Sequence, residues 1–127
     1  MLSVAVSVGR LVCVVEDDAD VRASARLLLE STGYRVADFA NAEAFLRATD
    51  GRDAACLVFD LHMGGMTGLE LLENLRSAGV QTPAIIVTAS ADDLEARCTR
   101  AGTLAVLRKP PSASDMLGWI ARACSSH

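Results

Sequence analysis

The stretch Leu11–Asp18, with the sequence LVCVVEDD, changes abruptly from an apolar, valine-rich run to an acidic cluster. A short β-branched run of this kind predicts a strand that is buried on both faces. Four similar runs follow, at Arg35–Phe39, Cys56–Phe59, Ala84–Val87 and Leu104–Leu107. Segments with helical periodicity alternate with these runs, which indicates βαβ units. The predicted fold class is therefore α/β, a doubly wound sheet of five parallel strands.

Five helices are predicted between and after the strands. Asp18, Asn41 and Thr67 each stand where a helix N-cap is needed. Either Ser112 or Ser114 can cap the last helix, which follows two prolines. The expected helical segments are the one between Asp18 and Gly33, then Ala42–Ala48, Gly68–Ala78, a weaker Ser90–Ala101, and the stretch around Met116–Cys124.

Length and composition favour one domain, since single domains commonly run to about 100–150 residues. We expect an N-terminal extension over residues 1–10, the domain over residues 11–124 and a tail over residues 125–127. Apolar residues make up 51% of the chain and charged residues 22%, as in globular proteins. The net charge of −4 gives no general attraction to nucleic acid or to anionic membranes.

The four cysteines lie far apart in the sequence and show no spacing typical of metal binding. We expect them to be reduced and mostly buried; they are Cys13, Cys56, Cys98 and Cys124. The apolar start of the chain is interrupted by Gly9 and Arg10, well short of a membrane span. These features predict a cytoplasmic protein without a transmembrane helix or secretory signal.

Polar residues stand where the predicted strands end, and ligands of open parallel sheets bind beyond those ends. Glu16 and Asp17 follow the first strand, Asp60 the third, Thr88 the fourth and Lys109 the fifth. Any one of them alone has an ordinary structural explanation, but together they predict one site. Two unit charges about 4 Å apart repel by ~4 kcal/mol at an effective dielectric near 20, so clustered carboxylates need a cation. Oxygen ligands favour Mg²⁺, or Mn²⁺ as a substitute.

At these positions the sequence resembles the response-regulator receiver family of two-component signalling. The match spans about residues 11–123, and its motifs are specific in combination because they occur in order at successive strand ends. The resemblance implies a flavodoxin-like (βα)5 fold with strand order 2-1-3-4-5. The residues that carry it are Val14-Val15-Glu16-Asp17-Asp18, Val58-Phe59-Asp60-Leu61-His62-Met63, Gly68-Leu69-Glu70-Leu71, Ile86-Val87-Thr88-Ala89 and Arg108-Lys109-Pro110.

The resemblance implies that Asp60 accepts a phosphoryl group from a histidine kinase or a histidine phosphotransfer protein. It also implies that Asp17 and Asp60 bind Mg²⁺ directly, together with the backbone carbonyl of His62, while Glu16 acts through metal-bound water. Asp18 is expected to serve only as a helix cap. Such a domain is not an enzyme with a separate substrate, since it catalyses only its own phosphorylation and dephosphorylation.

The remaining site residues are assigned by the same resemblance. Lys109 is expected to pair with a phosphoryl oxygen and the Thr88 hydroxyl to hydrogen-bond another. The Lys109–Pro110 peptide is expected to be cis. His62 and Ser90 occupy the positions that tune the lifetime of the acyl phosphate in receivers.

Two positions depart from the family pattern. Gly64 stands where receivers usually have a proline, so we expect Gly64-Gly65 to give the loop after Asp60 more backbone freedom. Val106 replaces the usual Tyr or Phe of the fifth strand. Because valine is stiff and short, we expect weaker coupling between Thr88 and the output face formed by helix four, strand five and helix five.

Asn41–Leu46 makes the chain most similar to receivers of helix-turn-helix transcriptional regulators. A stand-alone receiver and a piece of a longer regulator both fit the sequence. One alternative function is a receiver-fold interaction module that works without phosphorylation. Another is a phosphatase with an aspartyl-phosphate intermediate, but its Asp-x-Asp spacing is absent after the third strand, where Asp60-Leu61-His62 stands.

Overall fold

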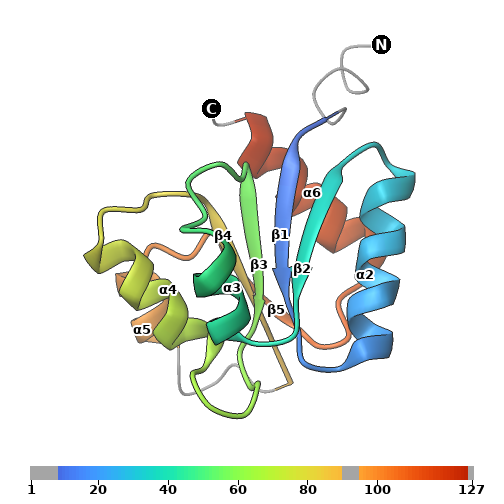
Figure 1. Ribbon diagram of the computed structural model, residues 1–127. Helices are drawn as coiled ribbons and strands as arrows, with labels where there is room; N and C mark the ends of the chain where they lie inside the picture. The colour runs from blue at the N-terminus through green and yellow to red at the C-terminus, as the bar shows by residue number, and fades with distance from the viewer. Residues whose placement is uncertain (1–8, 90–94, 126–127) are drawn as a thin grey trace.

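The computed structural model describes residues 9–89 and 95–125. Strands and helices alternate along the chain, as predicted (Figure 1). The strands are β1 (Leu11–Val15), β2 (Arg35–Phe39), β3 (Cys56–Asp60), β4 (Ala84–Thr88) and β5 (Ala105–Arg108). The helices are α2 (Ala19–Ser31), α3 (Ala42–Ala48), α4 (Gly68–Ser77), α5 (Glu95–Arg100) and α6 (Ala113–Ser125).

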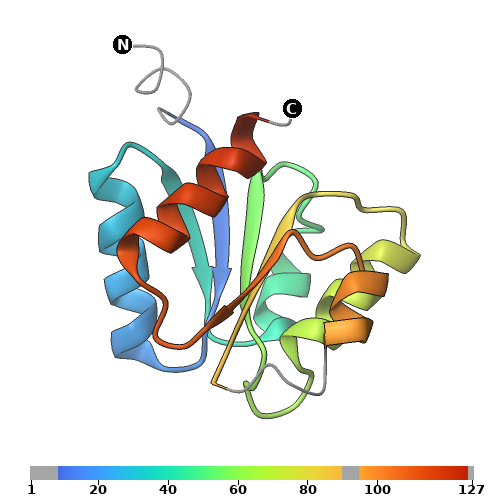
Figure 2. The same cartoon turned by 180° about the vertical axis from the view of Figure 1, so that it is seen from behind.

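The strands form one parallel sheet in the order β2-β1-β3-β4-β5, which confirms the predicted fold class and strand order. Successive strand residues alternate between two cores. Cys13 and Val15 of β1 face one core with α3, α4 and α5, whereas Val12 and Val14 face the other with α2 and α6. Figure 2 shows α6 crossing the second face. Burial on both faces explains why these strands are continuous apolar runs.

Aromatic rings fix α3 on its face of the sheet. The Phe45 ring of α3 is fully buried and packs edge-on against Phe39 of β2 and Phe59 of β3, with both centroid separations at 5.4 Å. Such edge-to-face pairs are favourable beyond the apolar area that they bury. They hold α3 across β2 and β3 on the side of the sheet away from α2 and α6.

The helix caps follow the expected chemistry. The Asp18 carboxylate accepts from the backbone N–H groups of residues 20 and 21, and Asn41 caps α3. Thr67 forms a reciprocal capping box with Glu70 at the start of α4. Of the two candidates for the last helix, Ser112 is the cap, because its hydroxyl accepts from the N–H of residue 115 at 3.0 Å.

Several boundaries differ from the prediction by a residue. β5 covers Ala105–Arg108 instead of Leu104–Leu107, because parallel pairing with β4 sets its register. α4 ends at Ser77 with Ala78 as its C-cap, and α6 includes Ser125. In the fourth predicted helix the structure describes α5 from Glu95, while residues 90–94 lie outside the described residues, as do 1–8 and 126–127.

All four cysteines are free thiols and buried, as predicted. Burial raises the pKa of the Cys13 thiol to about 11. A low pKa and exposure are what make a thiol reactive, so Cys13 is a core residue. Within residues 9–89 and 95–125, none of the helices is both long and apolar enough to cross a membrane.

A close contact at Gly68 joins the start of α4 to the end of β3. A Cβ atom at this position would collide with the Asp60 carbonyl oxygen and would lie 3.0 Å from the Phe59 Cβ. In α6, by contrast, a Cβ at Gly118 would meet nothing within 4 Å. Only a residue without a side chain therefore lets α4 begin beside Asp60.

We expect Gly68→Ala to destabilise the protein by about 1–3 kcal/mol, because the backbone must shift to accommodate the methyl group. The matched change Gly118→Ala should stabilise it by about 0.5–1 kcal/mol, since alanine is the better residue inside a helix. Urea unfolding of both variants measures the two effects. Equal stability of the two variants would contradict the proposed close contact.

Candidate functional site

The carboxyl ends of β1 and β3 bring three carboxylates together. Oxygen atoms of Glu16, Asp17 and Asp60 lie within 4.8 Å of one another. Glu16 and Asp60 are each only 5% exposed, whereas Asp17 is exposed. The predicted acidic cluster is thus present, with two buried members and one that faces solvent.

Lys109 bridges the two buried carboxylates from the segment that follows β5. Its Nζ atom lies 2.9 Å from Glu16 Oε1 and 3.3 Å from Asp60 Oδ2. Burial alone would lower the pKa of the Lys109 ammonium, but the two carboxylates outweigh it and raise that pKa. The ammonium therefore stays charged and partly neutralises the cluster. The Lys109–Pro110 peptide is cis, as expected.

The surroundings of Asp60 disfavour the ionised form of its carboxyl group. Burial, followed by repulsion from Glu16, raises the pKa of Asp60 from 3.8 to about 6, although Lys109 acts in the opposite direction. The Asp60 carboxylate is still predominantly ionised at neutral pH. The protein thus does not fully offset the negative charge of this carboxylate, whose oxygens can act as a nucleophile or as metal ligands.

Glu16 is held in place by contacts other than Lys109. Its Oε2 atom accepts from the Asp18 backbone N–H at 3.0 Å. Its backbone carbonyl oxygen accepts from Arg22 Nη1 of α2 at 2.8 Å. Side chain and main chain at the end of β1 are therefore both fixed.

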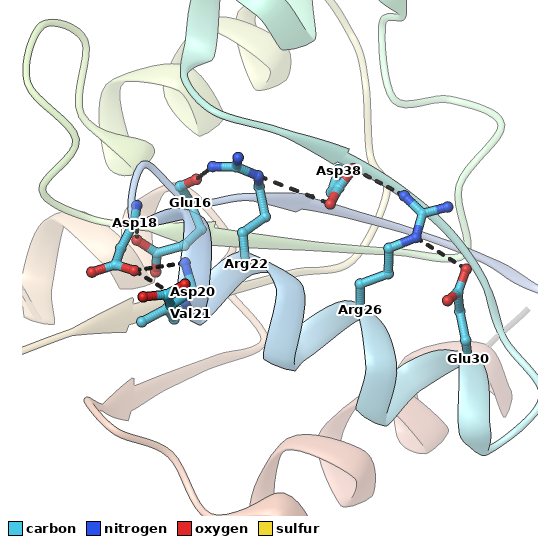
Figure 3. Close-up of polar contacts among 8 residues, drawn as sticks. All are labelled: Glu16, Asp18, Asp20, Val21, Arg22, Arg26, Glu30 and Asp38. Atoms are coloured by element: carbon cyan, nitrogen blue, oxygen red, sulfur yellow. Dashed lines mark hydrogen bonds and ion pairs between the residues drawn. The ribbon is translucent and has the colours of Figure 1, made fainter.

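Arg22 belongs to a network that ties the acidic site to α2 and β2 (Figure 3). Its Nε atom lies 3.9 Å from Asp38 Oδ2, and Arg26 Nη1 pairs with Asp38 Oδ1 at 3.0 Å. Arg26 also pairs with Glu30, one helical turn further along. Sequence reasoning missed Arg22, although its place in the first turns of the helix that follows the acidic pair was a possible signal.

Thr88 and Lys109 lie at the ends of neighbouring strands. The Lys109 N–H donates to the Thr88 carbonyl oxygen at 2.8 Å, so the backbone directly joins the two residues. Thr88 is 1% exposed. Thr88 and Lys109, together with Glu16, Asp17 and Asp60, stand at the carboxyl ends of β1, β3, β4 and β5. The structure thus brings all five predicted side chains to one edge of the sheet.

The loop after Asp60 lies largely at the surface of the protein. The His62 side chain is exposed, and Gly64 and Gly65 have positive φ angles of 49° and 87°. Proline fixes φ at about −65°, so the backbone at Gly64 has a conformation that the proline usual at this position could not adopt. Val106 is half-buried and packs against the core on the face of the sheet that α3, α4 and α5 cover. Ser90 lies outside the described residues.

The donor set fits a hard divalent cation. It consists of carboxylate oxygens, and Mg²⁺ binds oxygen ligands at about 2.1 Å, so oxygens on opposite sides of the ion are about 4 Å apart. A spread of 4.8 Å needs only small side-chain rotations to match this distance. Two buried carboxylates beside one ammonium also leave negative charge for such an ion to offset.

These features define a doubly wound domain with an acidic site at the carboxyl ends of its strands. The response regulator receiver domain family matches residues 12–121. The chain therefore belongs to this family and is a receiver domain of two-component signalling.

Similar proteins include transcriptional regulators. FixJ of Bradyrhizobium diazoefficiens is 37% identical over 98 residues, which cover 76% of this chain and 48% of FixJ. TmoT, a response regulator protein of Ectopseudomonas mendocina, is 32% identical over 114 residues, which cover 89% of this chain and 52% of TmoT. The chain thus spans about half the length of these relatives.

Solved structures agree with this assignment. The crystal structure of FixJ-N superposes with a TM-score of 0.82 at 32% identity and covers 93% of this chain and 95% of that one. The response regulator StyR superposes with a TM-score of 0.85 at 34% identity, covering 93% of this chain and 60% of StyR. Both comparisons support the fold of the chain.

The raised pKa of Asp60 makes the stability of the metal-free protein depend on pH. Because the folded pKa of about 6 exceeds 3.8, the folded state binds the proton more tightly, and ionisation costs stability as pH rises between these values. Asp60→Asn does not titrate. We therefore expect it to be more stable than the wild type by on the order of 2–3 kcal/mol above pH 7, and equally stable below pH 4.

Urea unfolding in the presence of a chelator, at several pH values, measures this difference. Asp50→Asn is a suitable control because Asp50 is an exposed carboxylate outside the site. A stability gain for Asp60→Asn that is the same at every pH would contradict the electrostatic explanation.

The Arg22 network gives a second expectation. Arg22→Met removes the hydrogen bond to the Glu16 carbonyl oxygen, and we expect a loss of about 1.5–3 kcal/mol, as is typical for a hydrogen bond from a charged group. Arg26→Met breaks more exposed ion pairs and should cost less than about 1 kcal/mol. Thermal and urea unfolding compare the two variants. A larger loss in Arg26→Met would show that the tether to Glu16 is not the important contact.

Proposed function

We propose that this receiver accepts a phosphoryl group on Asp60 from a histidine kinase or a histidine phosphotransfer protein, in a Mg²⁺-dependent reaction. The observation that carries the proposal is the surroundings of Asp60. Its buried carboxylate lies 3.3 Å from the Lys109 ammonium and within 4.8 Å of the Glu16 and Asp17 carboxylates. A carboxylate suited to nucleophilic attack, an ammonium group and a carboxylate cluster suited to a divalent cation thus lie side by side.

In the proposed reaction an Asp60 oxygen attacks the phosphorus atom of a phosphohistidine. The new O–P bond forms an acyl phosphate while the N–P bond breaks and the imidazole leaves. Lys109 pairs with a phosphoryl oxygen, and the Thr88 hydroxyl donates to another. Asp17, Asp60 and the His62 carbonyl would hold Mg²⁺, with Glu16 acting through water. When bound, Mg²⁺ or Mn²⁺ would offset the negative charge of the phosphoryl group.

The acyl phosphate is expected to change how the domain binds a partner. The proposed output face consists of α5, β5 and α6. The Lys109 N–H donates to the Thr88 carbonyl oxygen, which links Thr88 to the segment that directly follows β5. Since the relatives are named as transcriptional regulators, the switch is expected to act on an attached output domain or on a separate partner protein. The weaker coupling expected from Val106 stays a prediction. His62 and Ser90 are proposed to set the lifetime of the acyl phosphate.

The main alternative is an interaction module of the same fold that works without phosphorylation. It differs from the proposed function in one measurable respect, because its partner binding would not depend on Asp60 chemistry. The chain offers a close control for Asp60 in Asp18, a carboxylate of the same acidic region whose side chain caps α2. Asparagine is an equally good N-cap, so Asp18→Asn should leave the fold intact.

Incubation with acetyl phosphate and Mg²⁺ should add one phosphoryl group to the wild type and to Asp18→Asn, measured by intact-protein mass spectrometry. Asp60→Asn should add none, because it lacks the nucleophilic oxygen. Removal of Mg²⁺ with a chelator should slow the wild type by at least about tenfold. If the folded wild type also acquires no phosphoryl group under these conditions, the phosphorylation-independent module becomes the better explanation.

A further inference from the structure

A polar cavity lies at the opposite end of the sheet from the acidic site. It has a volume of about 570 Å³ and lies where β1 and β2 begin, next to the loops that precede β3 and β4. β1 begins and α6 ends at this end of the sheet (Figure 1). The volume is in the range of small-molecule sites, roughly 300–1,000 Å³. We call it the amino-end cavity; its lining comprises residues 9–11, 35, 52–55 and 79–82.

The charge of the amino-end cavity is opposite to that of the whole chain. Arg10, Arg35 and Arg52 line it from separate segments, and Asp53 is its one carboxylate. The chain as a whole has a net charge of −4. Among residues 9–89 and 95–125, neither Arg10 nor Arg35 has a carboxylate within ion-pair distance. The cavity therefore presents positive charge that the described residues do not neutralise.

Two of the three guanidinium groups are held in position by backbone oxygens. Arg35 Nε donates to the Gly9 carbonyl oxygen at 2.8 Å, and Arg52 Nη2 donates to the Ala78 carbonyl oxygen at 2.8 Å. Each bond uses one of the five N–H groups of an arginine. Arg52 Nε also lies 3.7 Å from Asp50 Oδ2, but both side chains are about half exposed, so this pair is weak. The guanidinium groups are thus partly ordered before a ligand arrives.

We propose that the amino-end cavity binds the diphosphate group of a small anionic ligand. Guanidinium groups match the geometry of phosphate oxygens and bind them through paired hydrogen bonds. Arg35 and Arg52 line the cavity from β2 and from the loop before β3, and each has N–H groups left to donate, so a diphosphate can offer one phosphate to each guanidinium group. Free diphosphate and a nucleoside diphosphate share this chemistry. The site is independent of phosphorylation at Asp60.

The test is a titration of the full chain with pyrophosphate, and separately with ADP, followed by backbone amide NMR. A chelator removes divalent cations, and sodium chloride keeps the ionic strength constant because salt screens exposed charges. We expect saturable shifts of amides in residues 9–11, 35, 52–55 and 79–82. Arg35→Gln and Arg52→Gln should each weaken binding about fivefold or more, because each removes charge-assisted hydrogen bonds. Arg47→Gln, an exposed arginine of α3 outside the cavity, should not.

Each outcome decides the proposal. Saturable shifts with pyrophosphate that weaken in Arg35→Gln support it, and tighter binding of ADP identifies a nucleoside diphosphate as the better ligand. Shifts that do not saturate, that sodium chloride alone reproduces, or that appear only around residues 60, 88 and 109 would overturn it. Equal effects of Arg35→Gln and Arg47→Gln would also overturn it, since they would indicate a general charge effect.

Discussion

The contact of one ammonium with two buried carboxylates is the interaction on which this site depends. Glu16 and Asp60 end neighbouring parallel strands, so the sheet itself forces their charges together. Burying both without a partner would be prohibitively costly, and the Lys109 ammonium makes the arrangement possible. The ammonium does not fully offset the two negative charges, as the raised pKa of Asp60, about 6, indicates. The site thus keeps negative charge that Lys109 does not offset.

Much of the surrounding structure serves to keep these groups in place. α2 fixes the end of β1 through Arg22 and the cap at Asp18, and the Thr88 carbonyl fixes the backbone of Lys109. Gly68 allows α4 to start directly beside Asp60. These contacts come from both faces and from several strands of the sheet. The Asp60 carboxylate is therefore held by helices and strands on both sides of it, whereas the glycine residues of the loop that follows it are exposed.

The two ends of the sheet differ in charge. Carboxylates gather where the strands end, and arginines gather where β1 and β2 begin. This separation places a proposed phosphoryl site and a proposed diphosphate site at opposite ends of one sheet. A ligand at the amino end would contact the starts of the same β-strands whose other ends carry the acidic residues. The two sites share the sheet and no side chain.

The fold class, most of the element boundaries and the charged residues of the site follow from the sequence alone, because apolar runs that stop at Glu16, at Asp60 and at Arg108, next to Lys109, are local patterns. The strand order came from the family resemblance. Only the tertiary structure decided the register of β5, which depends on pairing with β4, and the role of Arg22, which depends on how α2 lies against β1. Such contacts join residues whose spacing carries no periodic pattern, so they cannot be read from local sequence.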